Sequence, residues 1–214
     1  MRNFLFLIIT TALIISCKNN NNSVNIPAAD NFLVTDSAWG PITAATDFEN
    51  LKKLFGETNV KDELICGPEC INSILVTKLY PGQKNETIIY WNDTAFHKKI
   101  SLIECFRDSA DWHTADGIKI GSPFADLLKV NGSKISFSGF GWDYGGHISS
   151  FNGGRLSNTR IGYRLTLMDD PQTNDVYGDT TLHTDTPAIK KNMNIISVYW
   201  LTLSFYEPAE EETP

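Results

Sequence analysis

Apolar and polar positions follow two patterns along this chain, one with the period of a helix and one with the period of a strand. Apolar residues at helical spacing, Phe48 to Leu54 and Phe124 to Leu128, each form one face of a short amphipathic helix. Each helix precedes apolar runs bounded by turn residues, which predict strands. These runs lie near 59–65, 73–80, 87–91 and 99–106, and near 134–138, 147–151, 160–167 and 194–205. Their spacing favours antiparallel meanders over βαβ units and predicts the α+β class.

Both helices carry recognisable start and stop signals. Thr46 begins a capping-box pattern, in which its hydroxyl would satisfy a free N–H of the first turn. Ser122 followed by Pro123 is typical of a helix start, since proline suits the first helical position. Gly56 and Gly132 stand where a left-handed residue commonly ends a helix.

The two helical segments are similar to each other at a constant offset of 76 residues. Residues 42–56 (ITAATDFENLKKLFG) and 118–132 (IKIGSPFADLLKVNG) agree at five of fifteen positions. The identical pairs are Ile42/Ile118, Phe48/Phe124, Leu51/Leu127, Lys53/Lys129 and Gly56/Gly132. A chance match of two amphipathic helices is the alternative. We expect two tandem repeats, each a short helix packed on a four-stranded antiparallel meander sheet, with Phe48 and Phe124 buried at equivalent places.

The repeated pattern I-x₃-[ST]-x-F-x₂-L-x₄-G, followed by a short meander, resembles the small envelope modules of the outer-membrane assembly lipoprotein (SmpA/OmlA) class. The tandem arrangement is similar to that of β-lactamase-inhibitory proteins. The resemblance covers about 42–170 and the last strand. It rests on helix and turn positions, so it implies a fold and no binding residue.

An apolar run from Phe4 to Ile15 follows Arg2 and ends beside Cys17. It is shorter than the roughly 20 residues that a membrane-spanning helix needs, and it fits a secretory leader. The tetrad that ends in Cys17 resembles a bacterial lipobox, which implies a lipid on this cysteine; an uncleaved signal anchor is the alternative. We expect a signal peptide over 1–16, then the lipidated cysteine and a flexible tether over 17–31.

The mature chain is expected in the cell envelope, held by lipid at Cys17. Lys18 follows the cysteine, whereas enterobacterial lipoproteins that are retained at the inner membrane have aspartate at that position. This resemblance favours the outer membrane, which is where we expect the protein. The body divides into repeats over 32–107 and 108–206, and an acidic tail covers 207–214. The second repeat contains a polar insert near 169–192, which we expect to be a surface loop; its acidic spacing does not fit an EF-hand calcium site.

The charge balance argues against nucleic acid as a partner. The chain has 18 basic and 25 acidic residues, a net charge of −7, and no basic cluster. Nucleic-acid binding depends on neutralising phosphates with lysine and arginine. The expected partners are therefore the membrane, through lipid, and an envelope protein.

Three cysteines remain after Cys17. Cys66 and Cys70 flank a tight turn, and in an oxidising compartment they are a candidate disulfide. Cys105 would then be a buried free thiol. A zinc site is a poor alternative because two thiolates without a second ligand pair do not complete a tetrahedral shell. No metal or cofactor is expected.

The segment 139–147 concentrates unusual residues: four glycines with Trp142, Asp143, Tyr144 and His147. One interpretation is a partner-binding loop, since aromatic side chains give large contact area at low entropic cost. The other is a hairpin with strained turns, whose rings cover the edge of the core. In an extended segment Trp142 and Tyr144 would project on the same side and Asp143 on the opposite side.

A catalytic alternative uses His113 and Asp116 as an acid–base pair, joined in space by Asp143 and His147. No nucleophile motif accompanies these residues. The competing interpretation is a connection between repeats, with Trp112 packed between the halves. We therefore expect a non-catalytic envelope lipoprotein that binds a protein or a surface ligand, with an envelope hydrolase as the alternative.

Overall fold

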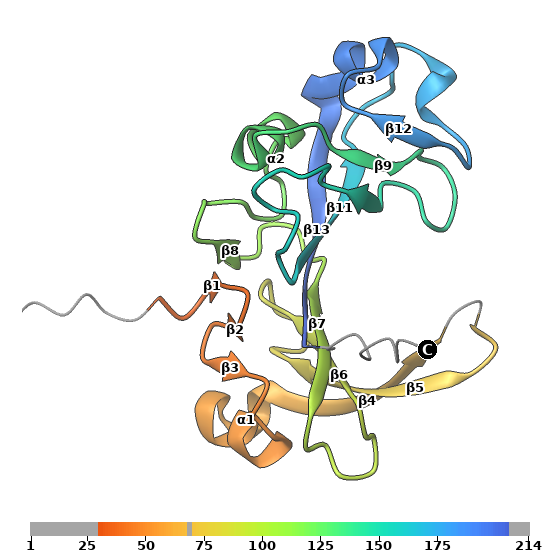
Figure 1. Ribbon diagram of the computed structural model, residues 1–214. Helices are drawn as coiled ribbons and strands as arrows, with labels where there is room; N and C mark the ends of the chain where they lie inside the picture. The colour runs from red at the N-terminus through yellow and green to blue at the C-terminus, as the bar shows by residue number, and fades with distance from the viewer. Residues whose placement is uncertain (1–29, 68–69, 206–214) are drawn as a thin grey trace, which may run out of the picture.

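The computed structural model describes residues 30–67 and 70–205, which form a mixed α+β body (Figure 1). The expected leader, Cys17, most of the tether and the acidic tail lie outside the described residues. The helices are α1 (Phe48–Phe55), α2 (Phe124–Asn131) and α3 (Pro187–Asn192), with 3₁₀ turns η1 (Glu57–Asn59), η3 (Asn174–Val176) and η4 (Met193–Ile195). The strands are β1 (Leu33–Val34), β2 (Ala38–Trp39), β3 (Ile42–Thr43), β4 (Val60–Cys66), β5 (Ser73–Leu79), β6 (Thr87–Trp91), β7 (Ile100–Cys105), β8 (His113–Thr114), β9 (Ser136–Ser138), β10 (Ile148–Ser150), β11 (Ile161–Leu167), β12 (Thr181–His183) and β13 (Ile196–Ser204).

The largest sheet has six antiparallel strands in the order β11-β13-β7-β6-β5-β4. Strands β4 to β7 are neighbours in chain order, which makes a four-stranded meander beside α1. Strand β13 lies between β7 and β11, with Leu201 opposite both Cys105 and Tyr163. The last strand of the chain therefore joins the two halves in one sheet (Figure 1).

The second half does not form a four-stranded meander sheet of its own. Strands β9 and β10 belong to a separate sheet of order β10-β9-β12, whereas β11 and β13 belong to the large sheet. A single bridge between His147 and Arg164 connects β10 to β11. The strands β9 and β10 span only three residues each, so they cannot continue the long ladders of the large sheet.

The polar insert near 169–192 is ordered, which differs from the expected surface loop. It contributes η3, β12 and α3, and β12 pairs with β9. Each of these elements buries one apolar side chain: Val176, Leu182 and Ile189. The sequence does not indicate that these three residues are buried, because each stands alone among polar residues without a helical or strand period.

One hydrophobic core runs through both halves. Trp112 is fully buried in it, with its ring centroid 5.0 Å from that of Phe32 and 5.3 Å from that of Trp39. Its indole N–H donates to the carbonyl of Asn85 at 3.2 Å. Trp112 is therefore packed in the core, as one interpretation of this segment expected, but these partners all belong to the first half of the body. Strand β1 also pairs with β8 in parallel, which ties the start of the body to its second half.

The helix caps differ from those expected. Asp47 caps α1 by accepting from the backbone N–H of Asn50 at 2.9 Å. The hydroxyl of Thr46 instead accepts from the N–H of Thr43, and α2 has no side-chain cap. The expected capping role of Thr46 is therefore wrong. A residue three places upstream competes for its hydroxyl, as is common for threonine and serine.

The burial of the two phenylalanines is also unequal. Phe124 has 0% of its surface exposed, whereas Phe48 is half-buried beside His97 and Lys52. Leu51 and Leu127 are both fully buried and occupy equivalent places in α1 and α2. The first helix lies against the end of the sheet, so its first residue is only partly covered.

Phe124→Ala is expected to lower the free energy of unfolding by about 3–5 kcal/mol, because a buried ring is lost and a cavity remains. Phe48→Ala should cost clearly less, since its ring is only half-buried. Equilibrium unfolding in urea measures both values. Equal losses in the two variants would contradict the difference in burial.

Candidate functional site

The segment 139–147 joins β9 to β10 and lies against β11 and the insert. Its glycines are required by close approach of other backbone segments. A Cβ on Gly146, which has φ of +73°, would lie 1.9 Å from the carbonyl oxygen of Leu165. A Cβ on Gly139 would lie 2.5 Å from the carbonyl oxygen of Gly178. The glycines therefore have a structural explanation, as one of the two interpretations of this segment expected.

The aromatic residues of this segment remain available to solvent. Tyr144 is 66% exposed and Trp142 is half-buried. Their ring centroids lie 5.3 Å apart at 62°, and the Trp142 indole N–H donates to the carbonyl of Gly139 at 2.7 Å. The backbone is turned here, with the N–H of Gly145 bonded to the carbonyl of Trp142, so the expected extended geometry is wrong. The turn nevertheless brings the two rings together.

Arg164 of β11 fixes this segment to the sheet. Its Nε donates to the carbonyl of Gly145 at 2.8 Å, and its Nη2 donates to the carbonyl of Asp143. The guanidinium carbon lies 5.4 Å from the ring centroid of Trp200, within the range of a cation–π contact. Arg164 thus links the loop, β11 and the aromatic side chain of β13.

Arg164 lines two cavities. One of about 570 Å³ is lined by Phe140, Gly141, Trp142, Gly145, Arg164, Leu165, Thr166, Leu167, Tyr177 and Tyr199. The other, of about 290 Å³, is lined mainly by apolar atoms, from Leu102, His147, Gly162, Tyr163, Arg164, Trp200 and Thr202. We call Trp142, Tyr144, Tyr177, Tyr199, Trp200 and Arg164 together the aromatic surface. It combines a rim of exposed rings with two recesses, which is the form of a binding site.

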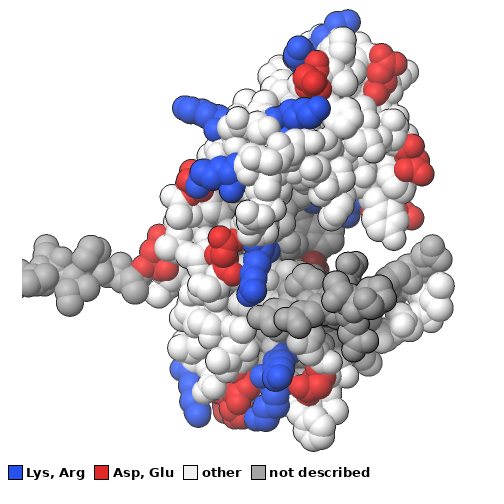
Figure 2. Space-filling model, viewed as in Figure 1, with Lys and Arg blue, Asp and Glu red and all other residues white. Residues whose placement is uncertain are grey.

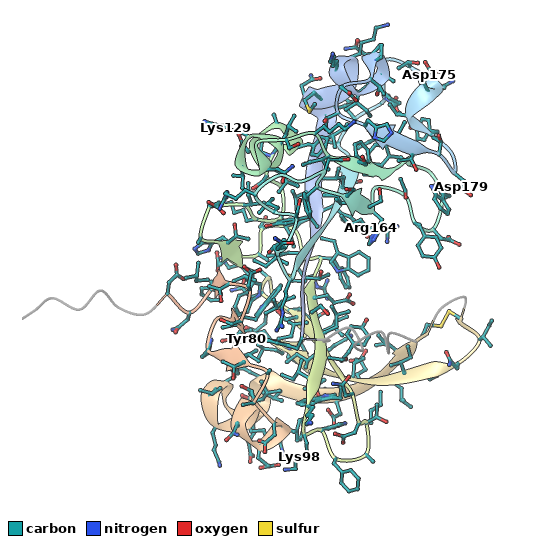
Figure 3. All side chains as sticks on the ribbon, viewed as in Figure 1. Tyr80, Lys98, Lys129, Arg164, Asp175 and Asp179 are labelled. Carbon is teal, nitrogen blue, oxygen red and sulfur yellow. A yellow bond between two sulfur atoms is a disulfide. The ribbon has the colours of Figure 1, made fainter. Side chains whose placement is uncertain are left out.

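Arg164 of the aromatic surface and the first strand lie on different sides of the body in the views drawn. In Figure 3 Arg164 is on the right, while Lys129 of α2 is on the left, and Figure 1 shows β1 on the left as well. The face drawn in Figure 2 carries acidic and basic side chains interspersed, without a basic patch.

A buried carboxyl lies near this surface, on the same face of the large sheet. Glu104 of β7 is 5% exposed and accepts a hydrogen bond from the hydroxyl of Tyr90 at 2.6 Å. Burial raises the pKa of Glu104, and the bond from Tyr90 offsets part of that rise. Burial beside this carboxyl also raises the pKa of Tyr90.

The residues of the catalytic alternative are not brought together. His113 lies 3.0 Å from the carboxylate of Asp30 and bonds the carbonyl of Asp111. Asp116 forms an ion pair with Arg155 at 2.5 Å. His147 lines the smaller cavity beside Trp200, and Asp143 is an exposed loop residue. Each of the four has its own surroundings, so the geometry provides no shared catalytic centre.

Of the three cysteines in the described residues, two are bonded to each other. A disulfide joins Cys66 and Cys70 at the turn between β4 and β5, with an S–S distance of 2.05 Å. Cys105 is buried and free, and burial raises the pKa of its thiol to about 11. Within residues 30–67 and 70–205, no three His, Cys, Asp or Glu side chains are gathered to hold a metal ion. In the same part of the chain, no helix has the length and apolar character required to cross a bilayer.

Sequence reasoning identified Trp142 and Tyr144 but missed the rest of the aromatic surface. Arg164 is the one cation of β11 and stands at a polar position of its apolar–polar alternation, which is a weak signal available in the sequence. Tyr199 and Trp200 belong to the apolar run near 194–205, which predicted a strand but no binding role. Tyr177 lies in the insert and carried no signal at all.

Comparison with known proteins adds no function. The chain matches no protein-family model, and no curated protein is similar enough to match it. Among solved structures it is similar to the uncharacterized protein yfeY from Escherichia coli, at 15% sequence identity and a TM-score of 0.48. The match covers 80% of this chain and 98% of that chain.

The variant Glu104→Gln should retain the bond with Tyr90 and remove a buried charge. Because the folded-state pKa of Glu104 is raised, the stability it contributes is present below its ordinary pKa of 4.5 and lost as pH rises through the folded value. The variant should therefore be more stable than the parent protein near neutral pH, with the difference vanishing at about pH 4. Urea unfolding at both pH values measures this; a constant difference would contradict the raised pKa.

Proposed function

We propose that this protein is a non-catalytic lipoprotein of the cell envelope, held by lipid on Cys17, and that its body binds a partner protein or a surface ligand through the aromatic surface. The outer membrane is the proposed location, on the basis of the lipobox resemblance and Lys18. The binding role is carried by one observation: Trp142 lines a cavity of about 570 Å³, and the exposed ring of Tyr144 packs edge-on against Trp142.

The physical case for binding rests on how this surface is built. Large rings that remain partly exposed offer contact area at low entropic cost, because each has only two side-chain torsions. Arg164 holds the loop against β11, so little further ordering is needed when a partner docks. Arg164 lies on the right in Figure 3, whereas β1, which follows the proposed tether in the chain, lies on the left in Figure 1.

A tandem duplication is part of the proposal, and local geometry at the same offset supports it. The N–H of Thr43 donates to the hydroxyl of Thr46, and that of Lys119 donates to the hydroxyl of Ser122. The helices Phe48–Phe55 and Phe124–Asn131 are both eight residues long and start 76 residues apart. Each is followed by a glycine with positive φ.

The duplicated unit extends beyond the helices. Strands β4 and β9 begin 76 residues apart, and β5, β6 and β7 have counterparts in β10, β11 and β13. The later strands deviate because the insert separates β11 from β13. The likeness to the SmpA/OmlA modules and to β-lactamase-inhibitory proteins is proposed at the level of this repeated helix and the order of the strands that follow it.

Cys17→Ala is expected to abolish lipidation and leave uncleaved precursor or soluble protein, because the thiol is the only acylation site that the lipobox provides. Metabolic labelling with palmitate, followed by membrane fractionation, measures this. Undiminished labelling of the variant would refute the lipoprotein assignment.

Trp142→Ala and Tyr144→Ala are each expected to weaken partner capture by about 2 kcal/mol or more, the size expected of a binding hot spot. The assay is crosslinked capture from native membranes, with the melting temperature measured in parallel. Phe96→Ala is the matched control, because that ring is 74% exposed but lies in the turn between β6 and β7.

The control should capture partners as the parent protein does. If both ring variants lower the melting temperature while the folded fraction captures partners normally, the rings have a structural role and the proposal fails.

A further inference from the structure

We propose that Arg164 is the recognition residue for a carboxylate, and that the aromatic surface takes an acidic peptide segment in which a glutamate or aspartate side chain neighbours an apolar or aromatic one. This inference rests on the proposed function and adds to it the chemistry of the ligand.

Arg164 carries a positive charge beside neutral hydrogen-bond acceptors. Its two recorded hydrogen-bond acceptors are the backbone carbonyls of Gly145 and Asp143, which are neutral groups. Within residues 30–67 and 70–205 it forms no ion pair with an acidic side chain. In the described part of the chain, the positive charge is therefore held in place without an acidic side chain paired to it.

The guanidinium of Arg164 is held in one orientation. The loop carbonyls occupy Nε and Nη2, and the Trp200 ring lies 5.4 Å from the guanidinium carbon. These contacts fix the plane and leave the N–H groups of Nη1 for a ligand. A fixed guanidinium loses little entropy when it binds a carboxylate, and such charge-assisted bonds are the stronger class.

An apolar cavity lies beside the charge of Arg164. The cavity of about 290 Å³ next to Arg164 is lined by Leu102, Trp200 and Thr202, among others. Gly162 stands opposite Thr202 in the sheet, and a Cβ there would lie 2.3 Å from the Thr202 hydroxyl oxygen. The absent side chain leaves the recess open beside the guanidinium. A ligand that fits must carry an anionic group and an apolar group side by side.

The net charge of −7 does not prevent such recognition. At physiological ionic strength, charges separated by more than about 8 Å are largely screened. The electrostatic interaction of a carboxylate that reaches the cavities is therefore determined mainly by Arg164. A peptide is favoured over a polyanion, because a single fixed cation beside two ring-lined recesses matches one acid flanked by apolar groups.

The test uses the full chain and two acetylated, amidated peptides, Ala-Tyr-Glu-Glu-Ala and its neutral match Ala-Tyr-Gln-Gln-Ala. Amidation removes the terminal carboxylate, so only side-chain acids are probed. Isothermal titration calorimetry should give the acidic peptide at least about tenfold higher affinity, and added salt should reduce this ratio.

Three variants test whether Arg164 causes the preference for the acidic peptide. Arg164→Gln should bring the ratio of the two affinities close to one, and Arg164→Lys should retain a preference for the acidic peptide because it retains the charge. Lys129→Gln, which makes the same change of charge on the opposite side of the body, should leave the ratio unchanged (Figure 3). The ratio is the readout because a disturbed loop would weaken both peptides alike.

Equal affinities in the parent protein, a ratio that persists in Arg164→Gln, or no binding of either peptide at millimolar concentration would overturn the inference. Binding of a glucuronate-bearing oligosaccharide in place of both peptides would overturn it too. If both peptides bind equally and Trp142→Ala weakens both, the carboxylate inference fails while the proposed function stands. If the acidic preference depends on Arg164 but capture from membranes is insensitive to Trp142 and Tyr144, the proposed function fails instead.

Discussion

The pairing of β13 with β7 on one side and β11 on the other holds this structure together. Main-chain hydrogen bonds along β13 make one sheet out of strands that are far apart in the chain. The same strand buries Val198, Leu201 and Leu203 in the common core. Without this strand the meander of the first half would end at β7, and β11 would have no partner in the large sheet. The central position of the strand explains why it is the longest in the described part of the chain.

The aromatic surface is a consequence of this arrangement. The register between β11 and β13 shifts where Arg164 pairs with Trp200 and Leu165 pairs with Val198, which leaves Tyr199 without a partner. Such a bulge redirects side chains and increases the local twist. Here it allows Tyr199 and Trp200, neighbours in the chain, to line two adjoining cavities. Arg164 lines both cavities and stands at the point where the ladder is irregular. Bulges are frequent at sites that re-aim side chains, and this position fits that role.

The glycine-rich segment has two physical explanations at once. Its glycines are dictated by contact: backbone carbonyls of Leu165 and Gly178 approach too closely for any Cβ. Its rings are not dictated in the same way, because Tyr144 is largely exposed and contributes little to the core. A purely structural hairpin has no need of an exposed tyrosine packed edge-on against a tryptophan. Within this short segment, the fold therefore requires the glycines, and the exposed rings are available for the proposed binding.

The sequence by itself determined the α+β class, both principal helices and the main strands to within about two residues, because periodicity and turn residues are local properties. It also identified Trp112 as a packed side chain and Trp142 with Tyr144 as a candidate surface. Tertiary structure decided how the strands were shared among sheets, the order of the insert, and the unequal burial of Phe48 and Phe124. These depend on pairings between residues far apart in the chain, such as His183 with Ser136, which no local pattern encodes. Arg164 illustrates the difference best: its sequence position says only that a strand carries a cation. Its role arises from carbonyls about twenty residues earlier and a ring on another strand, which only the folded chain brings together.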